Sequence, residues 1–445
     1  MLMFDHAADL HFIHQSDDRR VFLFLQGPSS PFFQMLADAL VKRGHEVRRI
    51  NICFGDRLFW HRREVAHYRG KLQDWPDFID RFIRDEKVTD IILLGDRRPH
   101  HLIALEKARA HGLGCYVTEL GYIRPDWITL ERDGMTSYSR FPMDPNVISE
   151  IAKDVPAPDL EPRYSGDFFK LAVWDVQYNL ANVFLWPFYP YYKWHALRHP
   201  LSEYAGWLVK LAKKPLTKRR TKAAIKTLKV GDAPFYLLPL QLQTDYQLRH
   251  HSAYPDQHTP IRQVIKSFAE NAPEDSKLVI KLHPLDNGLI NWRRFVAKTV
   301  KQQGMEDRVV FIDGGNLNKL IKASSGLITI NSTVGTAALG LACPVIALGT
   351  AIYDMPGLTH QKGLDLFWTR AEPPDASLWN DFVRVLAHTI QIKGGFYNSD
   401  ALKAAVAGAA ERLDNNTVNE PNAYVDPAPR SYRNTVGIGS ANVAQ

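Results

Sequence analysis

Lys281 and His283 lie two residues apart at the end of an apolar run, followed by Pro284. The run 277–282 predicts a strand, and residues two apart on a strand share one face. Both side chains donate hydrogen bonds to phosphate oxygens. Ligands bind at the carboxyl ends of strands in open α/β sheets, so this edge is a candidate phosphate site. The simpler interpretation is an ordinary strand end that Pro284 terminates.

A second candidate phosphate site is the hydroxyl-rich stretch 331–336, between a predicted strand, 327–330, and a helical pattern that ends near Leu341. Free backbone N–H groups at a helix start bind anions. An ordinary N-cap explains the same residues equally well. The sequence lacks the Gly-Lys-Ser/Thr of a Walker loop. The candidate residues are Asn331, Ser332, Thr333 and Gly335.

Two carboxylates follow predicted strands in different halves of the chain. Asp245 comes after the strand 235–240, and Glu119 ends a strand that starts at Gly114. A pair of carboxylates that flanks a sugar carbon supplies a nucleophile and an acid/base. Alternatively, Asp245 caps a turn and Glu119 pairs with Arg124.

Polar residues also follow the predicted strands of the first half. These turns line the facing wall of a cleft between two domains, and arginines there suit an anionic acceptor. Turn chemistry alone explains the Gly-Asp pairs. The residues are Gly27, Asp56, Asp96, Arg97 and Arg98.

Alternating strand and helix patterns predict the elements that position these residues. Apolar runs and amphipathic segments alternate over residues 21–118 and again over 234–348, which indicates parallel sheets covered by helices. We therefore expect an α/β fold with two Rossmann-like domains facing a cleft. The expected boundaries are 1–165, a linker at 166–230, 231–413 and a loose tail at 414–445.

The linker combines aromatic and basic residues. Nine aromatics fall between Trp174 and Trp194, and nine lysines or arginines without an acid fall between Lys210 and Lys229. This order suits a surface that contacts anionic lipid headgroups. Interdomain packing followed by a solvated helix is the alternative.

Composition restricts the classes of protein further. The net charge is +7, and the three cysteines are widely spaced, so we expect neither a disulfide framework nor a zinc cluster. The N-terminus has no signal-peptide pattern, and no apolar run is long enough to span a membrane. The sequence predicts a cytoplasmic protein.

Together, these stretches resemble the KpsS/LipB family of capsule polysaccharide synthesis proteins. The resemblance covers residues 21–370 and is carried by Gln26-Gly27-Pro28, Gly95-Asp96-Arg97, 119–126, 241–245, 283–286, 331–336 and 353–360.

The resemblance implies a GT-B-like retaining β-Kdo transferase that needs no metal and no cofactor. Its donor would be CMP-Kdo, and its acceptor an anionic, phosphatidylglycerol-type lipid at the inner face of the cytoplasmic membrane. The product would start the oligo-Kdo linker of a capsule. Capsule assembly proteins are further expected partners, and nucleic acid is not.

Roles follow from the same resemblance. Asp245 would be the nucleophile and Glu119 the acid/base. Two sets of residues would bind the substrates. The donor set is Lys281, His283, Pro284, Asn331, Ser332, Thr333 and Gly335, and the acceptor or sugar set is Gln26, Gly27, Asp56, Asp96, Arg97 and Arg124.

Three other functions compete with this hypothesis. A non-catalytic export or assembly factor would not need Asp245 or Glu119 to be acidic. A sugar-nucleotide epimerase or hydrolase would not explain a lipid-facing segment. Nucleic-acid binding by residues 210–229 is the weakest alternative, because no known nucleic-acid module accompanies them.

Overall fold

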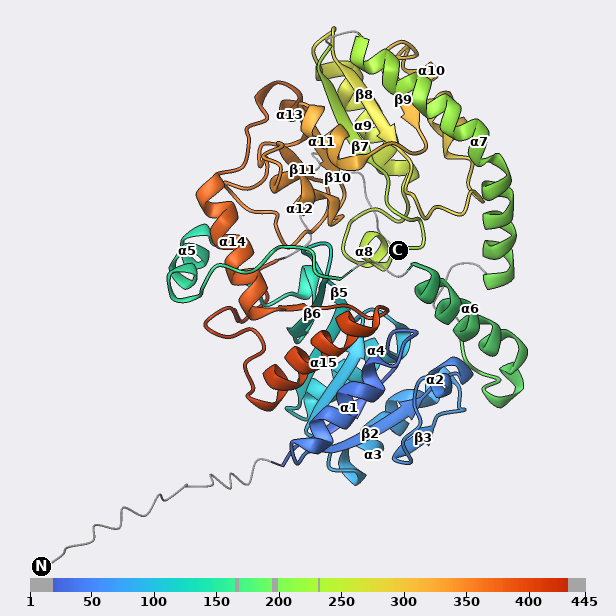
Figure 1. Cartoon of the computed structure of the whole chain (residues 1–445), viewed down its shortest axis with the longest axis vertical. Coiled ribbons are helices and arrows are strands. Elements are labelled where there is room, and N and C mark those ends of the chain that lie inside the picture. The colour runs from blue at the N-terminus through green and yellow to red at the C-terminus, as the bar shows by residue number, and fades with distance from the viewer. Residues whose placement is uncertain (1–18, 165–167, 194–198, 231–232, 431–445) are drawn as a thin grey trace, which may run out of the picture.

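The computed structural model describes residues 19–164, 168–193, 199–230 and 233–430. Two α/β domains lie one above the other, each around its own sheet (Figure 1). Some of the sequence-based expectations concern residues outside the described ranges. These residues are the N-terminal residues 1–18, Trp194 of the aromatic segment, and residues 431–445 of the expected tail.

The described residues of the first domain form a seven-stranded sheet in the order β12-β6-β5-β4-β1-β2-β3. The five strands from β5 to β3 run parallel, whereas β6 and β12 pair in antiparallel fashion. The strands are β1 (Val21–Phe24), β2 (Glu46–Asn51), β3 (Val65–His67), β4 (Asp90–Leu94), β5 (Gly114–Leu120), β6 (Trp127–Arg132) and β12 (Gln391–Lys393).

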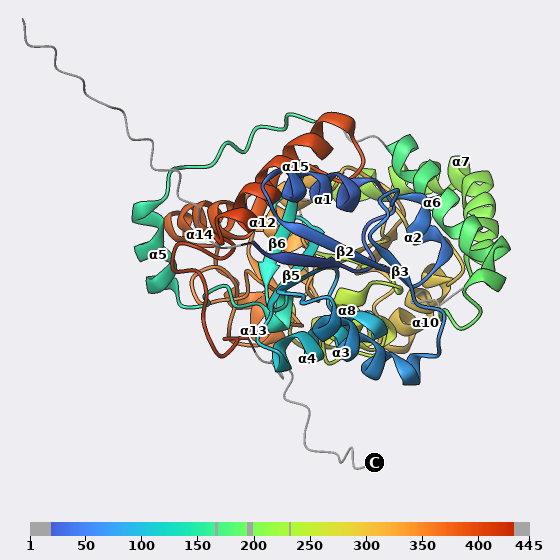
Figure 2. The ribbon, with the colours of Figure 1, turned by 90° about the horizontal axis from the view of Figure 1, so that it is seen from below.

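Helices cover both faces of the first sheet. Phe22 and Phe24 of β1 pack with α1 and α15, whereas Leu23 between them packs with α3 and α4, as the alternation of side chains along a strand requires. Figure 2 shows the two helix layers on opposite sides of the strands. The helices are α1 (Phe32–Lys42), α2 (Phe54–Leu58), α3 (Trp75–Asp85), α4 (Pro99–Ala110), α5 (Pro145–Asp154) and α15 (Ser399–Asp414), with 3-10 turns η1 (Leu72–Asp74) and η2 (Thr136–Tyr138).

The second domain contains a parallel five-stranded sheet in the order β11-β10-β7-β8-β9. Its strands are β7 (Phe235–Pro239), β8 (Lys277–Lys281), β9 (Val309–Ile312), β10 (Gly326–Thr329) and β11 (Val345–Ala347). Its helices are α8 (Tyr246–His250), α9 (His258–Asn271), α10 (Trp292–Gln302), α11 (Leu317–Ala323), α12 (Val334–Leu339) and α13 (Leu364–Arg370). Helix α14 (Ala376–Thr389) follows them in the chain and packs on α5 and β12 of the first domain.

The α/β class and the two Rossmann-like domains predicted from the sequence are confirmed. The expected boundaries need correction at the C-terminal end. Strand β12 joins the first sheet beside β6, and α15 packs on α1, so residues 391–414 belong to the first domain. Residues 415–430 are also packed rather than loose, because Val418 and Ala423 are fully buried. Local periodicity predicts strands and helices, but it does not predict which sheet a short strand joins or which helix an alanine-rich helix packs against.

The predicted linker forms two helices, α6 (Phe168–Phe184) and α7 (Pro200–Val230), around the 3-10 turn η3 (Trp186–Phe188). They lie along one side of the molecule, with α6 against α2 and α7 against β9 (Figure 1). Phe184 and Trp186 are 69% and 60% exposed, while Tyr178 and Tyr189 are buried. The aromatic segment therefore divides into a packing face and an exposed face. None of the described helices is long and apolar enough to cross a membrane.

Candidate active site at the domain interface

The carboxyl ends of β4 and β5 in the first domain meet the segments that follow β7 and β10 in the second. Several hydrogen bonds between described residues cross the interface directly, and two of them involve threonine hydroxyls. The Thr336 hydroxyl donates to the carbonyl oxygen of Tyr122 at 2.9 Å, and the Thr136 hydroxyl donates to Gln247 Oε1 at 2.6 Å. The two predicted carboxylates therefore approach one another from opposite domains.

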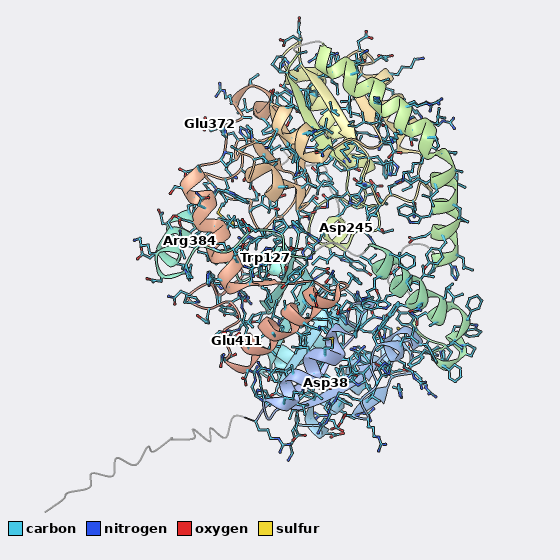
Figure 3. All side chains as sticks on the ribbon, in the orientation of Figure 1. Asp38, Trp127, Asp245, Glu372, Arg384 and Glu411 are labelled. Atoms are coloured by element: carbon cyan, nitrogen blue, oxygen red, sulfur yellow. The ribbon has the colours of Figure 1, made fainter. Side chains whose placement is uncertain are left out.

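Asp245 is the N-cap residue of α8 and accepts a hydrogen bond from the Gln247 backbone N–H at 2.9 Å. Figure 3 shows it between the two domains. Burial raises the pKa of Asp245, although the Gln247 N–H, Gln241, His251 and Arg124 all favour the ionised form. The capping role considered from the sequence is present. Asp245 also lies near Arg124 of the other domain. A helix cap does not require a cation nearby, so capping alone does not explain this arrangement.

Glu119 lies at the end of β5, beside the end of β4. A Cβ atom placed on Gly95 would lie 3.5 Å from Glu119 Oε2. Burial raises the pKa of Glu119, and the negative charge of Asp245 adds to this shift, while Arg98 and Arg124 oppose it. Burial lowers the pKa of Arg124, and the charges of Glu119 and Asp245 oppose that change. Two carboxylates and one guanidinium thus interact across the interface.

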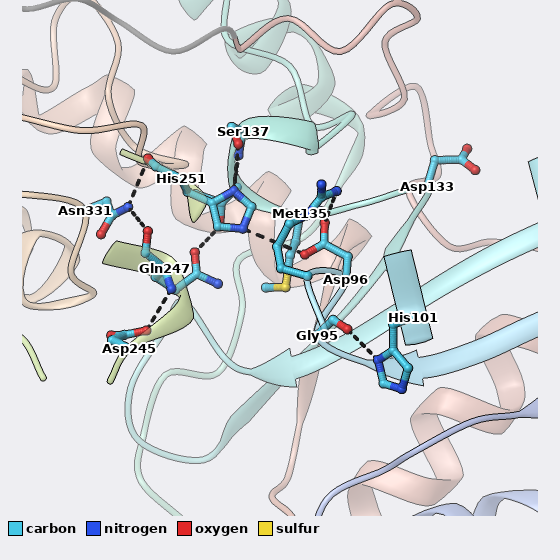
Figure 4. Close-up of polar contacts among 12 residues, drawn as sticks. Gly95, Asp96, His101, Asp133, Met135, Ser137, Asp245, Gln247, His251 and Asn331 are labelled. Carbon is cyan, nitrogen blue, oxygen red and sulfur yellow. Dashed lines mark hydrogen bonds and ion pairs between the residues drawn. The ribbon is translucent and has the colours of Figure 1, made fainter. Parts of the chain in front are cut away.

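A second charged cluster at this interface contains Asp96, His251 and Ser137 (Figure 4). His251 Nδ1 lies 2.6 Å from the Ser137 hydroxyl, and its Nε2 lies 3.8 Å from Asp96 Oδ1. Asp96 also accepts from the Met135 backbone N–H at 3.2 Å and pairs with Arg97 at 3.2 Å. Burial by itself raises the pKa of Asp96, but His251 and Arg97 outweigh burial and lower it to about 2. Asp96 is a fixed negative charge that joins the two domains.

Lys281 and His283 lie at the end of β8, as the sequence predicted. Burial lowers the pKa of both groups, and that of His283 falls to about 4, with Lys281 and Lys210 adding to the effect. His283 Nδ1 accepts from the Leu285 N–H at 3.0 Å, which leaves Nε2–H of the neutral ring as a donor. The carbonyl of Pro284 accepts from Lys210 on α7 at 2.9 Å.

The stretch 331–336 is largely engaged within the protein. Asn331 Nδ2 donates to the carbonyl of Gln247 at 2.7 Å, and its Oδ1 accepts from Gln241 at 2.9 Å. Ser332 Oγ accepts from the Val334 N–H at 3.2 Å, Thr333 is the N-cap residue of α12, and a Cβ on Gly335 would collide with Tyr353. These contacts hold the loop that carries Asp245 in place. They leave less of the stretch 331–336 open to an anion than the sequence predicted.

Three residues of the predicted acceptor wall make contacts inside the first domain. Gln26 Nε2 donates to the Tyr178 hydroxyl at 2.5 Å, and Asp56 accepts from the Ile52 N–H at 3.0 Å. A Cβ on Gly27 would collide with Phe33, so this glycine permits close packing. Gln26 is nevertheless connected to the interface, because its Oε1 accepts from Arg98 at 2.7 Å and Arg98 interacts with Glu119.

The comparisons with known proteins assign the family. The model for "Capsule polysaccharide biosynthesis protein" matches residues 89–397. The chain belongs to this family. It is 32% identical to the Escherichia coli "Capsule polysaccharide export protein KpsS" over 84% of this chain and 96% of that protein. It is 31% identical to the "Capsule polysaccharide modification protein LipB" of Neisseria meningitidis over 84% of this chain and 91% of that protein.

One solved structure with a similar arrangement is Thermosulfurimonas dismutans KpsC, described as a beta Kdo 2,7 transferase. It matches with 14% identity and a TM-score of 0.42, covering 89% of this chain and 99% of that chain.

Two residues at this interface had no role in the predicted catalytic, donor or acceptor sets, although Arg98 was among the arginines expected to line the cleft. Arg98 is close enough to Glu119 to lower its pKa, and its guanidinium donates to Gln26 Oε1 at 2.7 Å. His251 joins Asp96 across the interface. Arg98 directly follows the predicted Arg97, and His251 follows the 241–245 motif, so proximity in sequence was the available signal. Among the described residues, no group of three or more His, Cys, Asp or Glu side chains has the geometry of a metal site.

Proposed function

We propose that this capsule-family protein is a retaining β-Kdo transferase that moves Kdo from CMP-Kdo to a phosphatidylglycerol-type lipid. The observation that carries the proposal is that Glu119 and Asp245, which come from different domains, are near enough to influence one another and the same arginine, Arg124. Carboxylates that face a sugar from two sides provide both steps of a retaining transfer.

Asp245 acts in the first step. Its carboxylate attacks the anomeric carbon of Kdo, the bond from that carbon to the phosphate oxygen of CMP breaks, and CMP leaves with the bonding electrons. The Gln247 N–H and the charge of Arg124 favour the ionised nucleophile against the cost of burial. The product of this step is a covalent ester between Asp245 and the sugar.

Glu119 acts in the second step. It accepts the proton of the acceptor hydroxyl, whose oxygen attacks the anomeric carbon while the Asp245 carboxylate leaves. Burial and the neighbouring Asp245 raise the pKa of Glu119, and a raised pKa makes a carboxylate a stronger base. The sugar carboxylate pairs with Arg124 in this arrangement.

Lys281 and His283 are the proposed contacts of the CMP phosphate. Both lie at the carboxyl end of β8, the usual ligand edge of a parallel sheet. His283 remains neutral at physiological pH, because its pKa is lowered to about 4, and contributes the Nε2–H as a donor. The hydroxyls of Ser332 and Thr333 are further donors at the neighbouring β10–α12 turn.

Helices α6 and α7 are proposed to hold the protein on the inner face of the cytoplasmic membrane. Their exposed apolar side chains stand among the exposed lysines of α7, a combination that suits a lipid interface with anionic headgroups. The apolar residues are Phe169, Phe184, Trp186, Phe188, Leu208, Val209, Leu211 and Leu216.

The transfer reaction is tested directly by incubating the purified protein with CMP-Kdo, generated in place, and a fluorescent phosphatidylglycerol. Mass spectrometry should detect an acceptor that has gained one Kdo unit. CMP release at the rate of a protein-free blank, with no modified lipid, would contradict the proposal. That result would favour the non-catalytic export function that the printed name of the Escherichia coli relative suggests.

Membrane attachment is tested by replacing Lys213, Lys214 and Lys218 of α7 with glutamine. Each lysine near an anionic surface contributes about 1 kcal/mol, so binding to phosphatidylglycerol-rich vesicles should fall at least tenfold. Wild-type binding should weaken as salt rises. The control replaces three exposed lysines on other helices, Lys42, Lys153 and Lys403. Equal binding by both triple variants would exclude α7 as the attachment surface.

A further inference from the structure

A cavity of about 280 Å³ lies between the first domain and helices α6 and α7. One wall comes from the segments that follow β1 and β4, and the other from α6, the start of α7 and the loop before α15. This volume is at the lower end of small-molecule sites, which suits a monosaccharide or a glycerol-sized group. No residue assigned to the donor phosphate lines it.

The first-domain wall presents a fixed cation. Arg98 lines the cavity, and its guanidinium donates to Gln26 Oε1 at 2.7 Å. Gln26 in turn donates to the Tyr178 hydroxyl at 2.5 Å, and Tyr178 donates to Asp56 at 3.2 Å. This buried chain of hydrogen bonds orients Arg98 before any ligand arrives, so its remaining N–H groups can bind an anion.

The opposite wall presents hydrogen-bond acceptors and aromatic rings. Asp175 and Asn179 come from α6, with Asn179 Nδ2 donating to Asp175 Oδ2 at 3.1 Å, while Glu203 and Tyr204 come from the first turns of α7. Ionised carboxylates only accept hydrogen bonds, so they match ligand hydroxyls. Tyr397 adds a flat apolar face of the kind that packs on the carbon skeleton of a polyol.

The cavity is next to the proposed acid/base. Leu94, the last residue of β4, lines it, and the following residue, Gly95, is the one whose Cβ would lie 3.5 Å from Glu119 Oε2. Arg98 interacts with Glu119 as well as lining the cavity. Glu119 does not line the cavity itself, so Leu94 and Arg98 are the residues that connect the cavity to the proposed acid/base.

We propose that this cavity binds the polyhydroxylated, anionic part of a substrate, with its hydroxyls on Asp175, Asn179 and Glu203 and its anion on Arg98. The inference rests on the proposed function, which supplies two candidate ligands. They are the sugar acid of the donor and the glycerol phosphate headgroup of the acceptor. Both combine neighbouring hydroxyls with one negative charge, which is the complement of these walls.

The test measures binding without turnover, so that it does not depend on the transfer reaction. The probes are free Kdo and glycerophosphoglycerol, the deacylated headgroup, titrated in separate experiments by calorimetry. Asp175→Asn combined with Glu203→Gln should weaken binding of one probe at least tenfold. The control variant, Glu150→Gln with Asp154→Asn, changes two exposed carboxylates on α5 and should bind as wild type does.

The outcomes of these titrations either assign a ligand to the cavity or overturn the proposal. Selective loss of Kdo binding assigns the cavity to the donor sugar, and selective loss of glycerophosphoglycerol binding assigns it to the acceptor. Wild-type affinity of the cavity variant for both probes, or no binding of either probe by the wild type, overturns the proposal. Arg98→Lys, which keeps the charge without the planar fork, provides a second variant if the double variant melts early. Probe binding without transfer activity would overturn the proposed function while leaving the cavity assignment in place.

Discussion

Asp96 and Asp245 lie at the same domain interface, and their surroundings give them opposite properties. His251 and Arg97 lower the pKa of Asp96 to about 2, whereas burial raises the pKa of Asp245. Asp96 lies beside Arg97 and His251, while Asp245 has the Gln247 N–H and Gln241 at its carboxylate and Arg124 nearby. A carboxylate whose partners are satisfied stabilises the interface, and one with spare acceptor capacity remains available to a ligand.

The largest effect is expected from Asp245→Asn. The variant should lose at least a thousandfold in Kdo transfer, because an amide is not a nucleophile here. Its stability should change little, because Asn caps a helix about as well as Asp. Transfer rate and denaturant unfolding measure the two effects separately. Asp144→Asn is the matched control, since Asp144 caps α5 through the Asn146 N–H at 2.8 Å. Equal rates for the two variants would remove Asp245 from the chemistry.

Glu119→Gln should reduce transfer by about a hundredfold, the usual contribution of a general base. The wild-type rate should fall as the pH drops through the raised pKa of Glu119, because the protonated acid cannot accept a proton. The variant should lose this acidic limb. An unchanged pH–rate profile in Glu119→Gln would show that another group accepts the proton.

Asp96→Asn tests the structural side of the comparison. Removing one partner of a buried charge cluster costs roughly 3–5 kcal/mol, which urea unfolding at pH 7 would measure. Because the folded pKa is lowered from 3.8 to about 2, the wild-type advantage should shrink as the pH falls through that interval. Asp80→Asn breaks a more exposed Asp–His pair of 2.9 Å and should cost much less stability, because solvent screens exposed pairs. Equal costs for the two variants would remove the distinction.

The smallest effect is expected from Ser137→Ala. Ser137, His251 and Asp96 contain the residue types of a hydrolytic triad, but all three side chains are buried. The variant should lose about 1 kcal/mol of stability and keep its transfer rate. A loss of rate comparable to that of Asp245→Asn would instead place the Asp96 cluster in the chemistry.

Much of the second domain could be predicted from the sequence, because its strands are short apolar runs bounded by turns. The predicted strands at 235–240, 277–282 and 327–330 correspond to β7, β8 and β10. The antiparallel strand β12 could not be predicted in the same way. It has three residues and pairs with β6 from more than 250 residues away, so no local pattern marks it.

The candidate site likewise contains residues that the local sequence predicts and residues that it does not. Asp245, Glu119, Lys281 and His283 follow apolar runs, and their place at strand ends is a local consequence of sequence. Arg98 was expected only as one of the arginines that line the cleft, because its contact with Gln26, 72 residues away, is not visible in the local sequence. The chain by itself determined the two parallel sheets and the residue types at their edges. Only tertiary structure decided which of those residues share an environment, because burial and charge contacts between distant segments set each pKa and each open cavity.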